Sequence, residues 1–181
     1  KTVRSPMGSL FDLPDESEAA AADNADVFDL GRNGCRRLPD VTALDAFVTE
    51  ALAADNVGIS LYAAGEEAMT AEFEGLAISA ADGRTAYFSM PMPGETRDAA
   101  IAALRRLFGG GVTVVGNDIK RDMIVLRREG VGFTAPYFDT SVAHYLISPE
   151  TNHRLSTLAM IYLNYKTVDF DMTAAQIKKR S

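Results

Sequence analysis

Residues 112–130, VTVVGNDIKRDMIVLRREG, carry the pattern that decides the fold. The apolar run at 112–116 predicts a buried strand, and the amphipathic stretch at 118–129 predicts a helix that ends at Gly130. Asp118 and Asp122 lie four residues apart near the start of this helix. Two carboxylates in this place are either part of a metal site or solvated charges near a helix start, and the surrounding sequence has to distinguish the two.

The segments on either side complete the expected fold. PDVTALDAFVTEALAAD (39–55) predicts a helix with Asp40 as its N-cap, and NVGISLYA (56–63) predicts a strand. Two further strands are expected within 75–90 as a hairpin around Asp82-Gly83, followed by a helix within 94–111 capped by Thr96. Helices are also expected at 138–148 and 155–165. This order predicts an α/β fold, a ribonuclease H-like mixed β-sheet of three antiparallel strands and then a parallel strand, flanked by helices.

The charge of the chain is unevenly distributed. The formal net charge is -7, of which residues 1–35 carry -4, leaving the rest nearly neutral. The acidic, alanine-rich tail predicts a flexible interdomain linker at 1–35 followed by one domain at 36–181. A near-neutral body argues against strong, dedicated nucleic-acid binding, although Lys120 and Arg121 could contact a DNA backbone. No apolar run is long enough to cross a bilayer, so we expect a cytoplasmic protein with no membrane contact.

Three consecutive stretches carry a family resemblance: VGNDIKRDMIVLRREG, YFDTSVAHYLI and HRLSTLAMIYLNYKTV. Together they resemble the 3′-to-5′ exonuclease domain of bacterial family A DNA polymerases, the DNA polymerase I type, which carries G-x-N-x-K-x-D, then F-D-T, then L-x-x-L-A-x-x-x-L. The resemblance extends from about residue 36 to 168. It implies a fragment of a polymerase that acts in DNA replication and repair, with DNA, a 5′ nuclease domain and a polymerase domain as partners.

The resemblance also implies which residues a metal site would need. Such exonucleases bind two Mg²⁺ or Mn²⁺ ions through four carboxylates. By alignment with the family, Asp122 matches the third carboxylate, Asp118 stands where asparagine is usual, and Ser60 and Tyr62 occupy the two carboxylate positions of the first strand. The fourth carboxylate belongs to a C-terminal helix that this chain does not carry. We therefore expect a degenerate exonuclease-like domain that serves as a scaffold, in which Asp122 is the remnant of a metal site.

Two alternatives remain open at this stage. The first is a working exonuclease that binds Mg²⁺ or Mn²⁺ through a rearranged set of Asp118, Asp122 and the pair Glu72 and Glu74, which the pattern places just ahead of the second strand. The second is a module that holds single-stranded DNA without cutting it, with Tyr62 and Tyr87 as stacking platforms.

Other motifs have structural interpretations. His144 lacks a partner at catalytic spacing, His153 is expected in a loop, and the glycines at 109–111 precede a strand, which does not fit a phosphate-binding loop. In the tail, GSLFDL partly resembles a peptide that binds the bacterial sliding clamp. Leu10 and Phe11 would be the residues that bind it.

Overall fold

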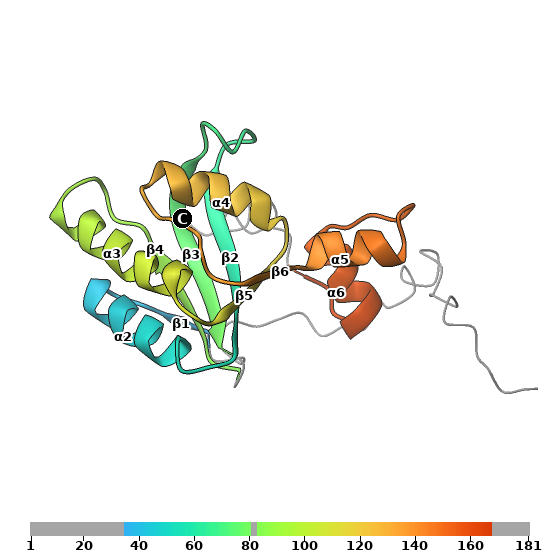
Figure 1. Cartoon of the computed structure of the whole chain (residues 1–181), viewed down its shortest axis with the longest axis horizontal. Helices are drawn as coiled ribbons and strands as arrows, with labels where there is room; N and C mark the ends of the chain where they lie inside the picture. The colour runs from blue at the N-terminus through green and yellow to red at the C-terminus, as the bar shows by residue number, and fades with distance from the viewer. Residues whose placement is uncertain (1–34, 81–82, 168–181) are drawn as a thin grey trace, which may run out of the picture. The chain divides into compact units, whose positions relative to one another are not determined.

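The computed structural model describes residues 35–80 and 83–167. The six strands that it describes are β1 (Arg36–Arg37), β2 (Asn56–Ala64), β3 (Glu72–Ala80), β4 (Thr85–Ser89), β5 (Thr113–Gly116) and β6 (Tyr137–Asp139). The helices in the same residues are α2 (Val41–Ala51), α3 (Glu95–Gly109), α4 (Ile119–Arg128), α5 (Thr140–Ile147) and α6 (Leu155–Leu163) (Figure 1).

All six strands form one mixed sheet in the order β1-β4-β3-β2-β5-β6. Strands β2, β3 and β4 pair antiparallel, and β5 then lies parallel to β2. This confirms the predicted succession of three antiparallel strands and a parallel one. Two short edge strands were not predicted: β1 pairs parallel with β4, and β6 pairs parallel with β5 where a helix was expected to begin.

The hydrophobic core lies between one face of this sheet and the helices. Val57, Ile59 and Leu61 of β2 face it, while Ser60 points to the other face, as the two-residue period of a strand requires. The helices that cover this face bury apolar residues at helical spacing, and this burial stabilises the fold. They are α2 with Leu44, Phe47, Val48 and Ala51; α3 with Ala100, Ile101, Ala103, Leu104, Leu107 and Phe108; and α4 with Val125 and Leu126.

Helix starts follow the sequence in one case and differ from it in another. The predicted N-cap Asp40 accepts a hydrogen bond from the backbone N–H of Ala43 at 2.8 Å, which satisfies one of the free donors at the start of α2. The prediction for Thr96 was wrong, because α3 begins two residues earlier at N-cap Gly94. Gly94 has φ +141, a backbone conformation that other residues rarely adopt.

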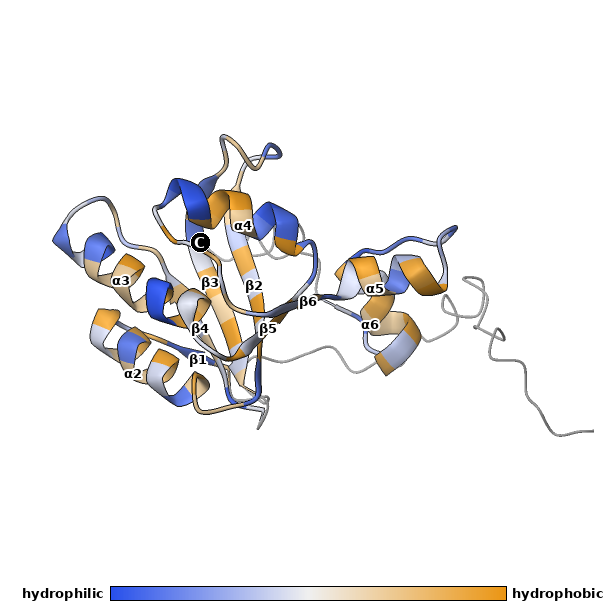
Figure 2. Cartoon of the chain, viewed as in Figure 1, coloured by the Kyte–Doolittle hydropathy of each residue, from blue (hydrophilic) through white to orange (hydrophobic). Residues whose placement is uncertain are grey.

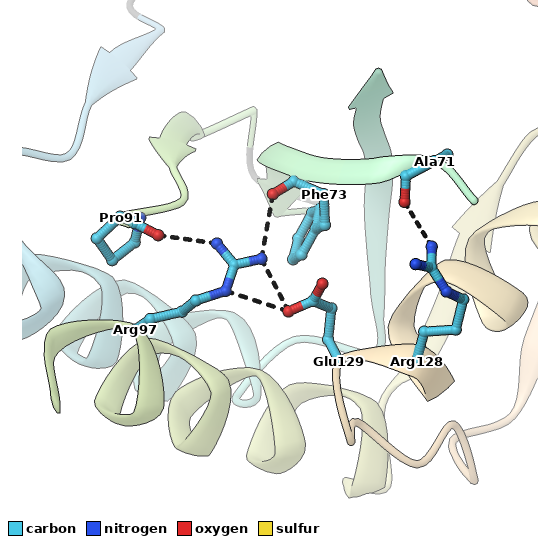
Figure 3. A network of polar contacts seen from close by, with 6 residues as sticks. All are labelled: Ala71, Phe73, Pro91, Arg97, Arg128 and Glu129. Carbon is cyan, nitrogen blue, oxygen red and sulfur yellow. Dashed lines mark hydrogen bonds and ion pairs between the residues drawn. The ribbon is translucent and has the colours of Figure 1, made fainter. Parts of the chain in front are cut away.

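Arginines fix the start of β3 to the helices (Figure 3). Arg97 of α3 pairs with Glu129 at 2.8 Å and also donates to the carbonyl oxygens of Pro91 and Phe73. Arg128 of α4 donates to the carbonyl of Ala71 at 2.6 Å. These bonds satisfy backbone acceptors where the chain enters β3, so the long connection between β2 and β3 is held at its C-terminal end.

Among the described residues, those from Cys35 to Leu155 form one compact unit, and those from 156 to 167 belong to a second one. Within α6, Leu158 and Ala159 are buried, and Asn164, with φ +49, ends the helix by donating its backbone N–H to Met160. In the part of the chain that the structure describes, no helix has the length and apolar character to span a membrane. The predicted linker at 1–35 and the clamp-binding residues Leu10 and Phe11 lie outside the described residues, except for Cys35 at the end of that linker.

Candidate functional site

A pocket of about 270 Å³ opens where the parallel strands β2 and β5 end. The last residue of β2 that pairs with β5 is Gly58, so the rest of β2 extends beyond its neighbour. The chain leaves β5 at Gly116 and turns directly into α4. The carboxyl ends of parallel strands are a common place for ligand sites in α/β sheets. The residues that line the pocket are Ile59, Ser60, Leu61, Asn117, Asp118, Arg121, Asp122 and Leu155.

Asp122 is the buried carboxyl of this pocket. Its side chain is on the first turn of α4 and only 6% of the residue is exposed. Burial raises the pKa of Asp122 from 3.8 to about 7, because the ionised form is poorly solvated there; the Arg121 charge opposes this shift, and the Asp118 and Asp139 charges add to it. The carboxyl of Asp122 therefore takes up a proton near neutral pH when no cation is bound.

The structure brings Ser60, Asp118 and Asp122 to one pocket. Ser60 and Tyr62 pair with Ala77 and Gly75 of β3. Their side chains lie on the face of the sheet that points away from the core. Tyr62 does not line the pocket. Of the two residues proposed to contact DNA, Arg121 lines this pocket, whereas Lys120 lines a separate hollow beside β6 and α5.

Glu72 and Glu74 lie elsewhere on the sheet. Both are exposed residues within β3, which begins at Glu72, so the prediction that they precede the strand was wrong. Glu72 pairs with Ala64, which lies four residues, or roughly 13 Å, along β2 from Ser60. Neither glutamate lines the pocket of Asp122. Within residues 35–80 and 83–167, no group of three or more His, Cys, Asp or Glu side chains is placed to hold a metal ion.

Tyr87, one of the stacking platforms considered above, shares a sheet face with Tyr62. It pairs with Ala77, which also pairs with Ser60, and side chains of paired residues point to the same side. Its hydroxyl lies over Gly75, where a Cβ would collide with it. Tyr87 is thus packed along the strand and half-buried, and it does not project as an open platform.

Sequence reasoning missed the role of Asp139. Its carboxylate accepts hydrogen bonds from the backbone N–H groups of Ile119 at 2.8 Å and Ser141 at 2.9 Å, and from the Ser141 hydroxyl at 2.7 Å. Desolvation raises the pKa of Asp139, but these donors, together with the N–H of Val142, outweigh it and lower the pKa below its usual value. One carboxylate thereby caps the starts of both α4 and α5. Asp-Thr-Ser before an apolar run is an N-cap signal that could have identified half of this role.

Polar contacts also fix the turn between β5 and α4. The Thr140 hydroxyl donates to the carbonyl of Gly116 at 3.1 Å, and the Asn117 amide donates to the Thr140 hydroxyl at 3.1 Å and to the carbonyl of His153 at 3.2 Å. Asp118 has a left-handed backbone with φ +59, which asparagine and aspartate tolerate better than most residues. The amide of Asn117 is therefore already used in holding the turn.

His144 and His153 form a pair. His144 is only 2% exposed, and its Nδ1 lies 2.8 Å from Nδ1 of His153, so one ring N–H donates a hydrogen bond to the other ring nitrogen. Burial lowers the pKa of His144, and the neighbouring His153 lowers it further. This arrangement agrees with the structural interpretation of both residues, because the pair packs α5 against the loop that follows it.

Comparisons with known proteins agree on one relationship. A family model described as 3′-5′ exonuclease matches residues 38–181. The chain is 25% identical over 166 residues to DNA polymerase I of Borreliella burgdorferi. This alignment covers 90% of this chain and 18% of that protein. It also resembles the POL domain of Pol1 from M. smegmatis in complex with DNA primer-template and dNTP, with a TM-score of 0.59 and 26% identity over 72% of this chain and 23% of that one.

More distant solved structures share the fold. The catalytic core of RRP6 from Trypanosoma brucei matches with a TM-score of 0.64 and 17% identity, over 87% of this chain and 43% of that one. Brucella melitensis NrnC with bound Mg²⁺ matches with a TM-score of 0.55 and 18% identity, over 75% and 62% of the two chains. These likenesses confirm the ribonuclease H-like architecture. The chain spans 18% of the Borreliella polymerase and 23% of the M. smegmatis chain, so it corresponds to a small part of each.

Proposed function

Because the chain belongs to the 3′-5′ exonuclease domains of the DNA polymerase I family, matched over residues 38–181, we propose that it is a degenerate member that has lost two-metal hydrolysis. Its function is then that of a scaffold inside a DNA polymerase, between a 5′ nuclease portion and the polymerase portion. Contact with DNA, and the parts played in replication and repair, belong to the whole polymerase.

One observation carries this proposal: Ser60 lies in the pocket of Asp122 at the position where the family pattern has a carboxylate. Two-metal hydrolysis needs several oxygen ligands, mostly carboxylates, around ions about 4 Å apart. The pocket offers the hydroxyl of Ser60, the side chain of Asn117, whose amide nitrogen already donates two hydrogen bonds, and only two carboxyls, those of Asp118 and Asp122. This donor set does not fit a pair of divalent cations.

An exposed apolar surface supports the scaffold role. On β6 and α5, large apolar side chains face solvent, and Leu146 is 78% exposed. In Figure 2, α5 carries orange, hydrophobic segments with a blue, hydrophilic one between them. Contiguous apolar surface of this kind on a soluble protein marks a contact with another protein or domain. We assign it to contact with the adjoining polymerase portion. The residues are Tyr137, Phe138, Val142, Tyr145, Leu146 and Ile147.

The test is digestion of a 3′-labelled single-stranded oligonucleotide by the chain and by the purified polymerase that contains it, with Mg²⁺ and then with Mn²⁺. We expect no metal-dependent shortening of the oligonucleotide. An active exonuclease of known structure serves as the positive control. Shortening by the wild-type protein that stops in an Asp122→Ala variant would refute the proposal and show that Asp122 is a working metal ligand.

A further inference from the structure

A positive side chain already projects to the pocket. Arg121 follows Asp118 on the first turn of α4 and lines the pocket beside Ser60 and Asp122. Its Nη2 atom donates to the carbonyl oxygen of Gly65 at 3.1 Å and to that of Ala63 at 3.3 Å. The guanidinium charge therefore sits between helix α4, which carries Asp122, and the end of β2, which follows Ser60.

The course of β2 explains why these carbonyls need such a donor. Pairing between β2 and β5 stops at Gly58, and β2 then continues past the end of its parallel neighbour. The strand also changes register with β3 between Tyr62 and Ala63, which disturbs the ladder on that side. The carbonyl of buried Ala63 must find a donor, whereas that of exposed Gly65 can also bond to water. Arg121 supplies one from the helix, so it ties the end of β2 to the first turn of α4.

In the two-metal site of the exonuclease pattern, divalent cations bridge carboxylates that come from a strand and from helices. We propose that Arg121 is the resident cation of this pocket: its guanidinium links α4 to β2 in place of metal ions and repels any divalent cation. This inference rests on the proposed loss of metal-dependent hydrolysis, and it adds a second cause. Replacing the lost carboxylates at 60 and 62 is then insufficient for metal binding while Arg121 remains.

The inference is tested by titrating the full 181-residue chain with Mn²⁺. Electron paramagnetic resonance measures the free Mn²⁺ at each step. The starting variant is Ser60→Asp/Tyr62→Glu. Adding Arg121→Gln removes the charge and keeps an amide donor for the two carbonyls. We expect this triple variant to bind Mn²⁺ at least about tenfold more tightly than the double variant, because a nearby unit charge opposes a divalent ion strongly in a pocket of reduced dielectric.

Two matched variants separate charge from shape. Arg121→Lys in the same double-variant background keeps the charge, so we expect it to bind Mn²⁺ as weakly as the double variant. Arg128→Met removes an arginine of the same helix that also donates to a backbone carbonyl, that of Ala71, but does not line the pocket. It should leave Mn²⁺ binding unchanged, since only a charge in the pocket opposes the metal.

Thermal unfolding with and without Mn²⁺ provides a second readout that survives if a variant folds poorly, because a bound metal stabilises the folded state. Equal Mn²⁺ affinity with Arg121 and with Arg121→Gln would overturn the inference, as would tight binding by the Arg121→Lys variant. Failure of the proposed function is distinct from both results, because it requires the wild-type protein itself to cut DNA in a metal-dependent way.

Discussion

Replacing Asp122 by asparagine should stabilise the protein at alkaline pH. The carboxyl has a pKa of 3.8 in the free state and about 7 in the fold. Between these values the folded state keeps a proton that the unfolded chain has released, so the free energy of unfolding falls as pH rises. Each pKa unit corresponds to about 1.4 kcal/mol, so the ionised carboxyl costs the fold about 4 kcal/mol once the pH exceeds 7.

The asparagine side chain has nearly the same shape as that of aspartate and does not ionise. Relative to wild type, the Asp122→Asn variant should be more stable by about 2 kcal/mol at pH 5 and by about 4 kcal/mol at pH 8, because part of the difference has already developed at pH 5. Urea unfolding followed by circular dichroism in buffers with EDTA measures this difference.

Asp55→Asn, a change at an exposed aspartate that lies at the start of β2, is the matched control and should show no such trend. A stability difference for Asp122→Asn that is the same at pH 5 and pH 8, or a wild type that is more stable at pH 8, would refute the reasoning. Either result would mean that Asp122 is stabilised as an anion by a cation or donor in solution.

Three further outcomes follow from the polar contacts. Asp139→Ala should lower the free energy of unfolding by about 2 kcal/mol at pH 7, because two helix starts lose their cap; in wild type this contribution is present above the ordinary aspartate pKa and is lost as pH falls through the lowered pKa of Asp139, which urea unfolding from pH 6 to pH 3 can follow. Arg97→Met should cost about 2 to 3 kcal/mol in the same assay, because Glu129 and two carbonyls lose their donor, whereas Arg84→Met, at an exposed ion pair, should cost under about 1 kcal/mol. His144→Gln should weaken the loss of stability below pH 6.5, since the stabilising contribution of neutral His144 is complete above its ordinary pKa of 6.5 and is lost as pH falls below 6.5 through its lowered pKa; identical acid profiles for variant and wild type would contradict this.

Local patterns were sufficient for most of the fold. Asp40 was identified as a cap because its side chain bonds only three residues ahead, and the strands β2 to β4 were identified from apolar runs and a turn signal. Strands β1 and β6 were missed because they contain two and three residues. Segments so short carry no periodicity, and only pairing with β4 and β5 defines them as strands.

The site was predictable only in part, for a related reason. The approach of Ser60 to Asp122 could be inferred because both positions belong to a recognisable pattern. The hydrogen bonds from Arg121 to the carbonyls of Ala63 and Gly65 depend on how far β2 extends past the end of β5. No short sequence motif predicts this extension. The double cap by Asp139 likewise requires the ends of β5 and β6 to be neighbours, since Gly116 pairs with Asp139 across the sheet.

The charges that line the pocket are consistent with a fold that binds no metal ions there. A cluster of carboxylates without cations would repel itself, and burial would raise the cost further. Ser60 is uncharged, Arg121 contributes a positive charge to the pocket, and Asp122 avoids the remaining cost near pH 7 by taking up a proton. Each of these features lowers the free energy of a metal-free fold, and each also weakens the attraction for divalent cations. Under the proposed loss of metal-dependent hydrolysis, the features that stabilise the pocket without cations are therefore the same ones that weaken metal binding.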